Sequence, residues 1–185
     1  LYNRSNIAII EREEKKISLK YILVILNSSL ISYYFMKNTA KSVRKMFPKI
    51  ILKDLRLFPF KEISIESQKP FIEKADIMLS LNKQKQEKVN KFLQRLETNF
   101  VIEKFTNKIK AFYNYDFKTL IAELKKKKIK LTLVQQDEWE EYFNIYQETI
   151  NQLQKQITQT DKEIDQMVYN LYGLTKEEIE IVEKN

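Results

Sequence analysis

The scarcity of glycine constrains the fold of this chain more than any other feature of its sequence. Its 185 residues contain a single glycine, Gly173, and only three prolines. A fold rich in β-strands needs many tight turns with positive φ angles, and glycine normally supplies them. We therefore expect long helices to dominate. The apolar share of 43% is ordinary for a protein that buries a core.

The composition also excludes several kinds of catalytic site. The chain has no cysteine and no histidine, which removes zinc sites built from these residues, histidine-based triads and disulfides. A single glycine cannot form a glycine-rich phosphate or dinucleotide loop. No two prolines are adjacent, so the Asn-Pro-Pro-Tyr motif of adenine methyltransferases is absent. We expect no catalytic residue, no cofactor site and no metal site in this chain.

The net charge of +8 is unevenly distributed along the chain. Residues 37–61 hold eight basic residues and one acidic residue, and residues 101–130 hold nine basic and three acidic residues. Residues 131–185, in contrast, hold four basic and twelve acidic residues. This distribution suggests that one surface meets a polyanion while the end of the chain faces away from it. Ordinary solvated lysines are the alternative explanation of the charge.

The first third of the chain predicts one strand and two helices. The short apolar run at residues 6–10 has the character of a strand. Ser18 can cap a helix that continues to about Lys37. A short helix can begin at Ile50, and Pro59 stops it. The residues between the two helices are irregular and basic.

Residues 19–36 form the most apolar stretch, but a lysine, an asparagine and several serines interrupt it. We expect a buried helix here and no membrane contact. No signal peptide is visible, and the lack of cysteine fits a reducing compartment, so we expect a cytoplasmic protein. Because the sequence begins with Leu1 and not with methionine, we also expect it to be a piece of a longer chain.

Two long helices with the spacing of a coiled coil follow. Residues 67–96 predict the first, with Pro70 in its first turn, and residues 134–172 predict the second. A possible capping box at Thr160 permits a break in the second helix. The expected seam of the first helix is Ile72, Ala75, Leu79, Asn82, Gln86, Val89, Leu93 and Leu96. The expected seam of the second is Trp139, Phe143, Tyr146, Ile150, Leu153, Ile157, Thr160, Ile164, Met167 and Leu171.

Capping signals set the ends of the remaining helices. A basic helix is expected from Asp116 to Lys128, where Asp116 offsets the unpaired N–H groups of the first turn. Thr132 has the spacing of a capping box for the next helix, and Thr175 for the last one. Gly173 stands where the residue after a helix end commonly takes a left-handed conformation.

The irregular segment after the first apolar helix holds the candidate DNA-binding residues. It is dense in positive charge beside an apolar anchor, Phe47, and functional residues concentrate in such loops. Arginine can fork onto a guanine, whereas lysine and serine mainly contact the DNA backbone. The candidates are Lys37, Lys41, Ser42, Arg44, Lys45 and Lys49. The lysine run at residues 125–128 can contact phosphates or complement a helix end, and we favour the second role.

Four stretches resemble the C-terminal specificity domain of type IIG restriction–modification enzymes and TaqI-like adenine-specific DNA methyltransferases. They are residues 23–30, 47–59, 125–143 and 164–175, in the order in which the family has them. The resemblance implies a module that recognises a DNA target sequence. It also implies an upstream methyltransferase domain that uses S-adenosylmethionine, with or without a fused endonuclease.

We therefore expect a mainly α, α+β fold with long antiparallel coiled-coil-like helices and a small β element at the N-terminal end. Residues 1–63 are expected to form part of a target-recognition domain, and residues 64–185 a helical bundle. The expected partners are double-stranded DNA and the upstream methyltransferase domain. Two alternatives stay open: a coiled-coil assembly module without DNA contact, and part of the specificity subunit of a multi-subunit restriction system.

Overall fold

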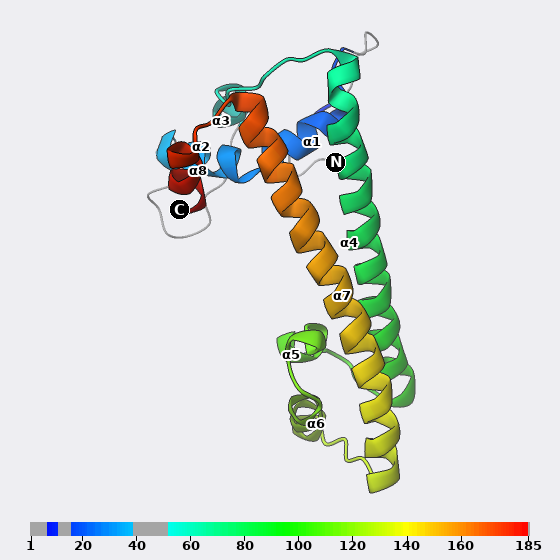
Figure 1. Ribbon diagram of the computed structural model, residues 1–185. Coiled ribbons are helices and arrows are strands. Elements are labelled where there is room, and N and C mark those ends of the chain that lie inside the picture. Colours follow the sequence, from blue (N-terminus) through cyan, green and yellow to red (C-terminus); the bar gives the residue numbers. More distant parts are fainter. Residues whose placement is uncertain (1–6, 11–15, 39–51, 185) are drawn as a thin grey trace. The chain divides into compact units, whose positions relative to one another are not determined.

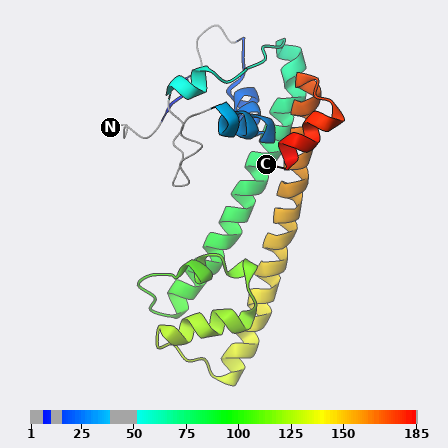
Figure 2. The same ribbon diagram turned by 90° about the vertical axis from the view of Figure 1, so that its left-hand side faces the viewer.

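Figure 1 shows the computed structural model of the chain, and Figure 2 shows it after a quarter turn. The structure describes residues 7–10, 16–38 and 52–184. This part is mostly helical (78%), which confirms the expected predominance of long helices. The helices are α1 (Leu19–Asn27), α2 (Ser29–Asn38), α3 (Leu52–Arg56), α4 (Ile65–Asn99), α5 (Asn107–Lys110), the 3-10 turn η1 (Phe112–Asn114), α6 (Phe117–Lys126), α7 (Leu133–Tyr172) and α8 (Lys176–Glu183).

The expected small β element is wrong. Residues 7–10 are described and form no strand, and no other described segment is a strand that could pair with them. Ile10 is 82% exposed, and Ile7 and Ile9 are about 40% exposed. A β-strand is stable only when a neighbouring strand takes up its backbone hydrogen bonds. Because no such neighbour is present in the described residues, β-branched composition alone does not produce a strand.

Two compact units make up the chain. The first contains residues 1–78 and 160–185, and the second contains residues 79–159. The helices α4 and α7 contribute residues to both units. The domain boundary expected at residue 63 lies within the first unit and stays a prediction.

The core of the first unit joins α1 and α2 to residues of α4 and α7. Its central side chain is Tyr21, whose ring meets Phe60 and Phe71 edge to face with centroids 5.4 and 5.3 Å apart. No single helix in the described ranges is long and apolar enough to cross a membrane, and only α1 and α2 taken together pass that test, by length and composition. The buried core residues are Tyr21, Val24, Ile25, Ile31, Phe71, Ala75, Ile164 and Val168.

The helix expected from Ser18 to Lys37 is in fact two helices, bent by 62° at Ser28. Ser18 caps α1 as expected, but Ser28 has an extended backbone and its hydroxyl donates to the Ile25 carbonyl at 2.8 Å. The break leaves the first N–H groups of α2 free to bond elsewhere. A carboxylate of α7, Asp165, accepts from the Ser29 backbone N–H at 2.8 Å and from the Ser29 hydroxyl at 2.6 Å. This distant carboxylate caps α2 and stabilises the break.

The core of the second unit is aromatic. Phe92 lies at its centre, fully buried, and stacks on Phe112 with ring centroids 3.8 Å apart. The short helices α5 and α6 lie beside this part of α4 and α7 (Figure 2) and close the core with apolar side chains. The buried residues are Val89, Phe92, Leu96, Ile102, Ile109, Phe112, Phe117, Leu120, Leu124, Phe143 and Ile150.

Helices α4 and α7 run antiparallel within each unit. In the first unit, Lys74 forms an ion pair with Glu163 at 2.6 Å. In the second, the Lys85 ammonium donates to the Gln154 side chain at 2.6 Å. Further along α4 in the second unit, Phe92 stacks on Tyr142, which precedes Gln154 on α7, as antiparallel helices require.

The seam expected on α7 is confirmed, because all ten of its positions are buried or half-buried. The seam expected on α4 is partly wrong. Leu79 is 49% exposed, and Asn82 and Gln86 are also exposed. In the turn that contains both residues, Phe92 is fully buried and the expected Leu93 is only half-buried. The physical reason is that the larger aromatic ring fits the space that Phe112 and its neighbours leave open.

The expected capping signals are largely confirmed. Thr175 forms a complete capping box at the start of α8, and Thr132 exchanges the corresponding two bonds with Gln135 at the start of α7. Gly173 has φ +72° and ends α7 with the two backbone bonds of a Schellman motif. The break that the sequence permitted at Thr160 does not occur, because α7 continues through this buried residue.

Candidate nucleic-acid interface

Only one of the six candidate DNA-binding residues lies in the described part of the chain. Lys37 is in the last turn of α2, exposed, with its ammonium 5.5 Å from the centre of the Tyr33 ring. The other five lie outside the described residues, as does the expected anchor Phe47. They are Lys41, Ser42, Arg44, Lys45 and Lys49.

Helix α3 adds two exposed basic side chains that the sequence analysis did not single out. They are Lys53 and Arg56, on a five-residue helix that buries none of its residues. The signal was present in the sequence, because both residues contribute to the excess of positive charge in residues 37–61. Both residues lie in the regular helix α3, outside the irregular loop that holds the predicted candidates.

Tyrosine hydroxyls anchor the backbone that follows α3. Tyr34 of α2 donates to the Leu57 carbonyl at 3.1 Å, and Tyr172 of α7 donates to the Pro59 carbonyl at 2.6 Å. Tyr21 of α1 donates to the Lys61 carbonyl at 2.7 Å. Burial raises the pKa of Tyr21 to about 12, so this phenol remains a proton donor at physiological pH.

Aromatic packing adds to these hydrogen bonds. The Phe58 ring meets the rings of Tyr34 and Phe35 edge to face, with centroids 5.9 and 6.2 Å apart. Because Tyr34 and Phe35 belong to α2 and Phe58 follows α3, the backbone that leaves α3 packs against α2. The first unit therefore holds Lys37 on one side of that segment and Arg56 on the other side.

A buried amide connects the chain before α1 to the start of α4. Gln68 is 1% exposed, and its side-chain oxygen accepts from the Ser18 backbone N–H at 2.8 Å. Its side-chain nitrogen donates to the carbonyls of Lys16 and Ile63 at 2.9 and 3.0 Å. One side chain thus satisfies three backbone groups from two separate segments. These bonds hold the residues before α1 against the start of α4.

The described residues offer little to a metal ion or a small-molecule cofactor. No group of three or more His, Cys, Asp or Glu side chains among them could hold a metal. A cavity of about 360 Å³ in the first unit is lined mainly by apolar side chains of α1 and by Ile7 and Ile9. It contains one charged side chain, Lys20, which pairs with Asp76 at 2.6 Å, so it lacks the convergent polar groups of a catalytic site.

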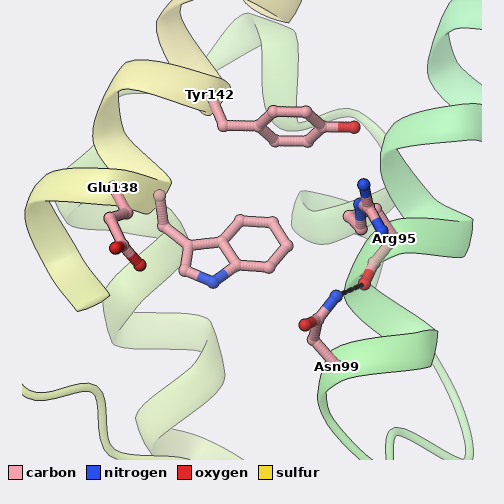
Figure 3. A pocket seen from close by; sticks show the side chains of 5 residues that line it. Arg95, Asn99, Glu138 and Tyr142 are labelled. Atoms are coloured by element: carbon pink, nitrogen blue, oxygen red, sulfur yellow. Dashed lines mark hydrogen bonds between the residues drawn. The ribbon is translucent and has the colours of Figure 1, made fainter.

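A second cavity, of about 230 Å³, lies between α4 and α7 in the second unit (Figure 3). Arg95 and Asn99 on α4 face Glu138 and Tyr142 on α7, and Trp139 completes the lining. The Asn99 amide donates to the backbone carbonyl of Arg95 at 2.8 Å. Burial raises the pKa of Tyr142 above its ordinary value, so its phenol does not serve as a base near neutral pH. The cavity is smaller than most ligand pockets, and we assign it no ligand.

Comparison with known proteins places the chain in a family. Residues 64–168, more than half of the chain, match the family model of a domain of unknown function (DUF8810). The chain belongs to this family. Residues 1–60 match a second family model, the TaqI-like C-terminal specificity domain. This match confirms the resemblance seen in the sequence, for the part that contains all six candidate residues.

No curated protein and no solved structure matches the chain. The two family models therefore carry the comparison. The specificity domain supports a DNA recognition module of restriction–modification enzymes as the general function of the chain. The DUF8810 family adds no activity, although it covers all of α4, α5 and α6 and most of α7.

Proposed function

We propose that this chain recognises the DNA target sequence of a type II restriction–modification adenine-specific DNA methyltransferase. The match of residues 1–60 to the TaqI-like C-terminal specificity domain carries the proposal. The excess of positive charge in residues 37–61 falls almost entirely within that match. A segment rich in lysine and arginine neutralises DNA phosphates and releases their condensed counterions, which supplies much of the binding free energy.

The two kinds of basic residue have different roles in this proposal. The lysines at positions 37, 41, 45 and 49 contact phosphates and set the register of the protein on the duplex. Arg44 reads sequence, because its guanidinium can donate two hydrogen bonds to O6 and N7 of one guanine. Phe58 packs on α2, so the backbone on both sides of the segment is held on one core.

The assembly-module alternative receives less support. A coiled-coil assembly helix needs an apolar seam that remains free for a partner chain. The seam of α7 is buried or half-buried within the chain itself, against α4 and the short helices in the second unit and against α1 and α4 in the first. The apolar seam that suggested an assembly module is therefore explained by packing within the chain.

We predict that the chain alone has no methyltransferase or endonuclease activity. In the proposed parent enzyme a separate upstream domain binds S-adenosylmethionine and carries the Asn-Pro-Pro-Tyr motif, and the 185-residue sequence lacks this motif. The measurement is transfer of a labelled methyl group to duplex DNA, with a complete adenine methyltransferase as positive control. Label in the DNA above the level without protein would contradict the prediction.

We predict that replacing Lys41 and Lys45 by alanine weakens duplex binding to all sequences alike. Each lost phosphate contact lowers the slope of log affinity against log salt by about 0.9, so the slope falls by up to about two units. Non-specific dissociation constants of such domains lie at roughly 10⁻⁴–10⁻⁶ M. The measurement is fluorescence anisotropy of a labelled duplex titrated at several salt concentrations.

Arg44→Ala in the parent enzyme serves as the matched variant for specificity. It is expected to relax discrimination at one base pair by about 1–3 kcal/mol, and not to weaken all sequences equally. If the double lysine variant binds like the wild type while the wild type binds DNA, the contact surface lies elsewhere. If the wild type itself does not bind duplex DNA, the proposed function fails.

A further inference from the structure

We propose that the surface formed by α5 and α6 in the second unit is a further DNA contact, which grips the phosphate backbone independently of sequence. It is separate from the candidate segment in residues 37–61. The inference takes its partner, duplex DNA, from the proposed function. It assigns a role to a part of the chain that lies entirely within the DUF8810 match.

The first observation is an excess of exposed positive charge that the neighbouring acidic side chains do not balance. Residues 101–130 carry nine lysines and three acidic residues. The acidic side chains are mostly used by the fold: Asp116 caps α6 by accepting from the Thr119 N–H at 2.8 Å, and Glu123 is 4% exposed and pairs with Lys126 at 2.6 Å. The exposed lysines are Lys104, Lys108, Lys110, Lys118, Lys125, Lys126, Lys128 and Lys130.

The second observation is a lysine in a backbone conformation that favours glycine. Lys128 has φ +63°, the only positive φ among described non-glycine residues. It ends α6 in a Schellman motif, in which its N–H donates to the Lys125 carbonyl and the Ile129 N–H donates to the Leu124 carbonyl. A side chain here costs stability relative to glycine. Lys125 and Lys126 already lie in the last turn, where cations complement the negative end of the helix. Neither the backbone conformation nor the helix dipole therefore requires a lysine side chain at position 128.

The third observation is that the lysine-bearing helices are held firmly. Helix α6 buries Phe117, Leu120 and Leu124 in the core of the second unit. The Gln147 amide of α7 donates to the Tyr115 carbonyl at 2.6 Å, which fixes the turn between α5 and α6. A fixed scaffold presents its charges without the entropic cost of ordering a loop on binding.

The chemistry of the surface favours a water-exposed polyanion over a membrane. Between residues 104 and 130, Tyr115 is the only large apolar side chain that is counted as exposed, at 38%. The Lys108 ammonium lies 5.5 Å from the centre of its ring. A membrane-surface helix presents a broad apolar face, and this one is turned inward. Asp137, Glu138, Glu140 and Glu141 place negative charge at the start of α7 in the same unit.

The test compares two triple variants of the full 185-residue chain that remove the same charge. Lys118→Gln, Lys125→Gln and Lys128→Gln change the proposed surface, whereas Lys83→Gln, Lys88→Gln and Lys155→Gln change exposed lysines of α4 and α7 in the same unit. In salt titrations of duplex binding, the first set is expected to lower the salt slope by up to about three units for every sequence tested. The second set is expected to change it by less than one. Equal effects of the two sets, or no effect of the first, would overturn the inference.

A single substitution separates the contact from any folding defect. Lys128→Gly is expected to raise the denaturation midpoint, because glycine relieves the left-handed backbone, and to lower the salt slope by about one unit. Damage to the fold cannot produce both changes together. A raised midpoint with an unchanged slope would contradict a DNA contact by Lys128.

The loop variant and a vesicle control distinguish this inference from the proposed function. One outcome is that the triple variant of Lys118, Lys125 and Lys128 loses affinity while Lys41→Ala with Lys45→Ala binds like the wild type. In that case the inference stands and the proposed loop site fails. If instead the loop variant loses affinity and the triple variant binds like the wild type, the inference fails and the proposed function stands. Vesicles of phosphatidylserine and phosphatidylcholine serve as the second polyanion, and tighter binding to them than to duplex DNA at the same salt concentration would overturn the assignment to DNA.

Discussion

Phe92→Ala is expected to lower the free energy of unfolding of the second unit by about 3–5 kcal/mol. The Phe92 side chain is 0% exposed. Its ring stacks on Phe112 at 3.8 Å and on Tyr142 at 5.7 Å, and it meets Phe143 edge to face at 6.1 Å between centroids. Removing it loses the transfer free energy of the ring and leaves a cavity that five neighbouring aromatic rings cannot fill without changing their rotamers.

The only tryptophan of the chain provides the measurement. Trp139 meets Phe92 edge to face at 6.2 Å, so its fluorescence in a urea titration reports on the packing of this core. Leu79→Ala is the matched control, because it removes an apolar side chain from the same helix and the same unit at a position that is 49% exposed. It is expected to cost less than about 1 kcal/mol. If Leu79→Ala costs as much as Phe92→Ala, the seam inferred from the sequence is the true one.

This contrast shows why one seam could be predicted and the other could not. On α7, nine of the ten seam positions between residues 139 and 171 are apolar, so the sequence favours one row, and Val168 and Tyr169 beside it are buried as well. On α4, the row through Leu79 and Leu93 and the row through Leu81 and Phe92 are almost equally apolar. Local spacing cannot choose between them, because the choice depends on rings that come from later segments of the chain.

Long-range hydrogen bonds explain the other differences in the fold. The helix through Ser28 reads as continuous from its apolar residues, but Asp165 lies 136 positions from Ser29 and caps the second half. The strand at residues 6–10 shows the opposite case, since its composition is suitable and no strand in the described residues pairs with it. Ends of helices were predictable because caps act within a few residues, as at Thr175 and Gly173.

The sequence predicts where the candidate site lies, and both its location and its member residues stay predictions. The density of positive charge in residues 37–61 pointed to the segment that the specificity-domain match contains. Lys53 and Arg56 were missed because the prediction was confined to the irregular loop and did not include the short helix that follows it. The anchoring bonds from Tyr34 and Tyr172 to the backbone after α3 have no sequence signal, since tyrosines at those positions fit a core equally well.

Gln68→Ala is expected to lower the free energy of unfolding of the first unit by about 2–5 kcal/mol. The substitution leaves the Ser18 N–H and the carbonyls of Lys16 and Ile63 without their partner. Each buried polar group left unsatisfied costs about 1–3 kcal/mol, and water that reaches some of them reduces the total. Chemical denaturation followed by circular dichroism gives the stability, and faster hydrogen exchange at the start of α1 gives the location.

Two further variants isolate the cause of that loss. Gln84→Ala removes the same side chain from an exposed position of α4, where its amide bonds only to Ser80, and is expected to change stability by less than about 0.5 kcal/mol.

Gln68→Glu keeps the shape but places a carboxylate against the two carbonyl oxygens that Gln68 now bonds. The folded state therefore holds the proton more tightly, and the pKa of the introduced carboxyl rises above its value in the unfolded chain. The stability of this variant therefore falls as the pH rises from the pKa of the carboxyl in the unfolded chain toward its pKa in the folded protein. The stability recovers in acid, where the protonated carboxyl can donate a hydrogen bond. A Gln68→Glu protein whose stability relative to wild type does not vary with pH, or a Gln68→Ala protein as stable as Gln84→Ala, would show that this amide does not hold the chain before α1 to α4.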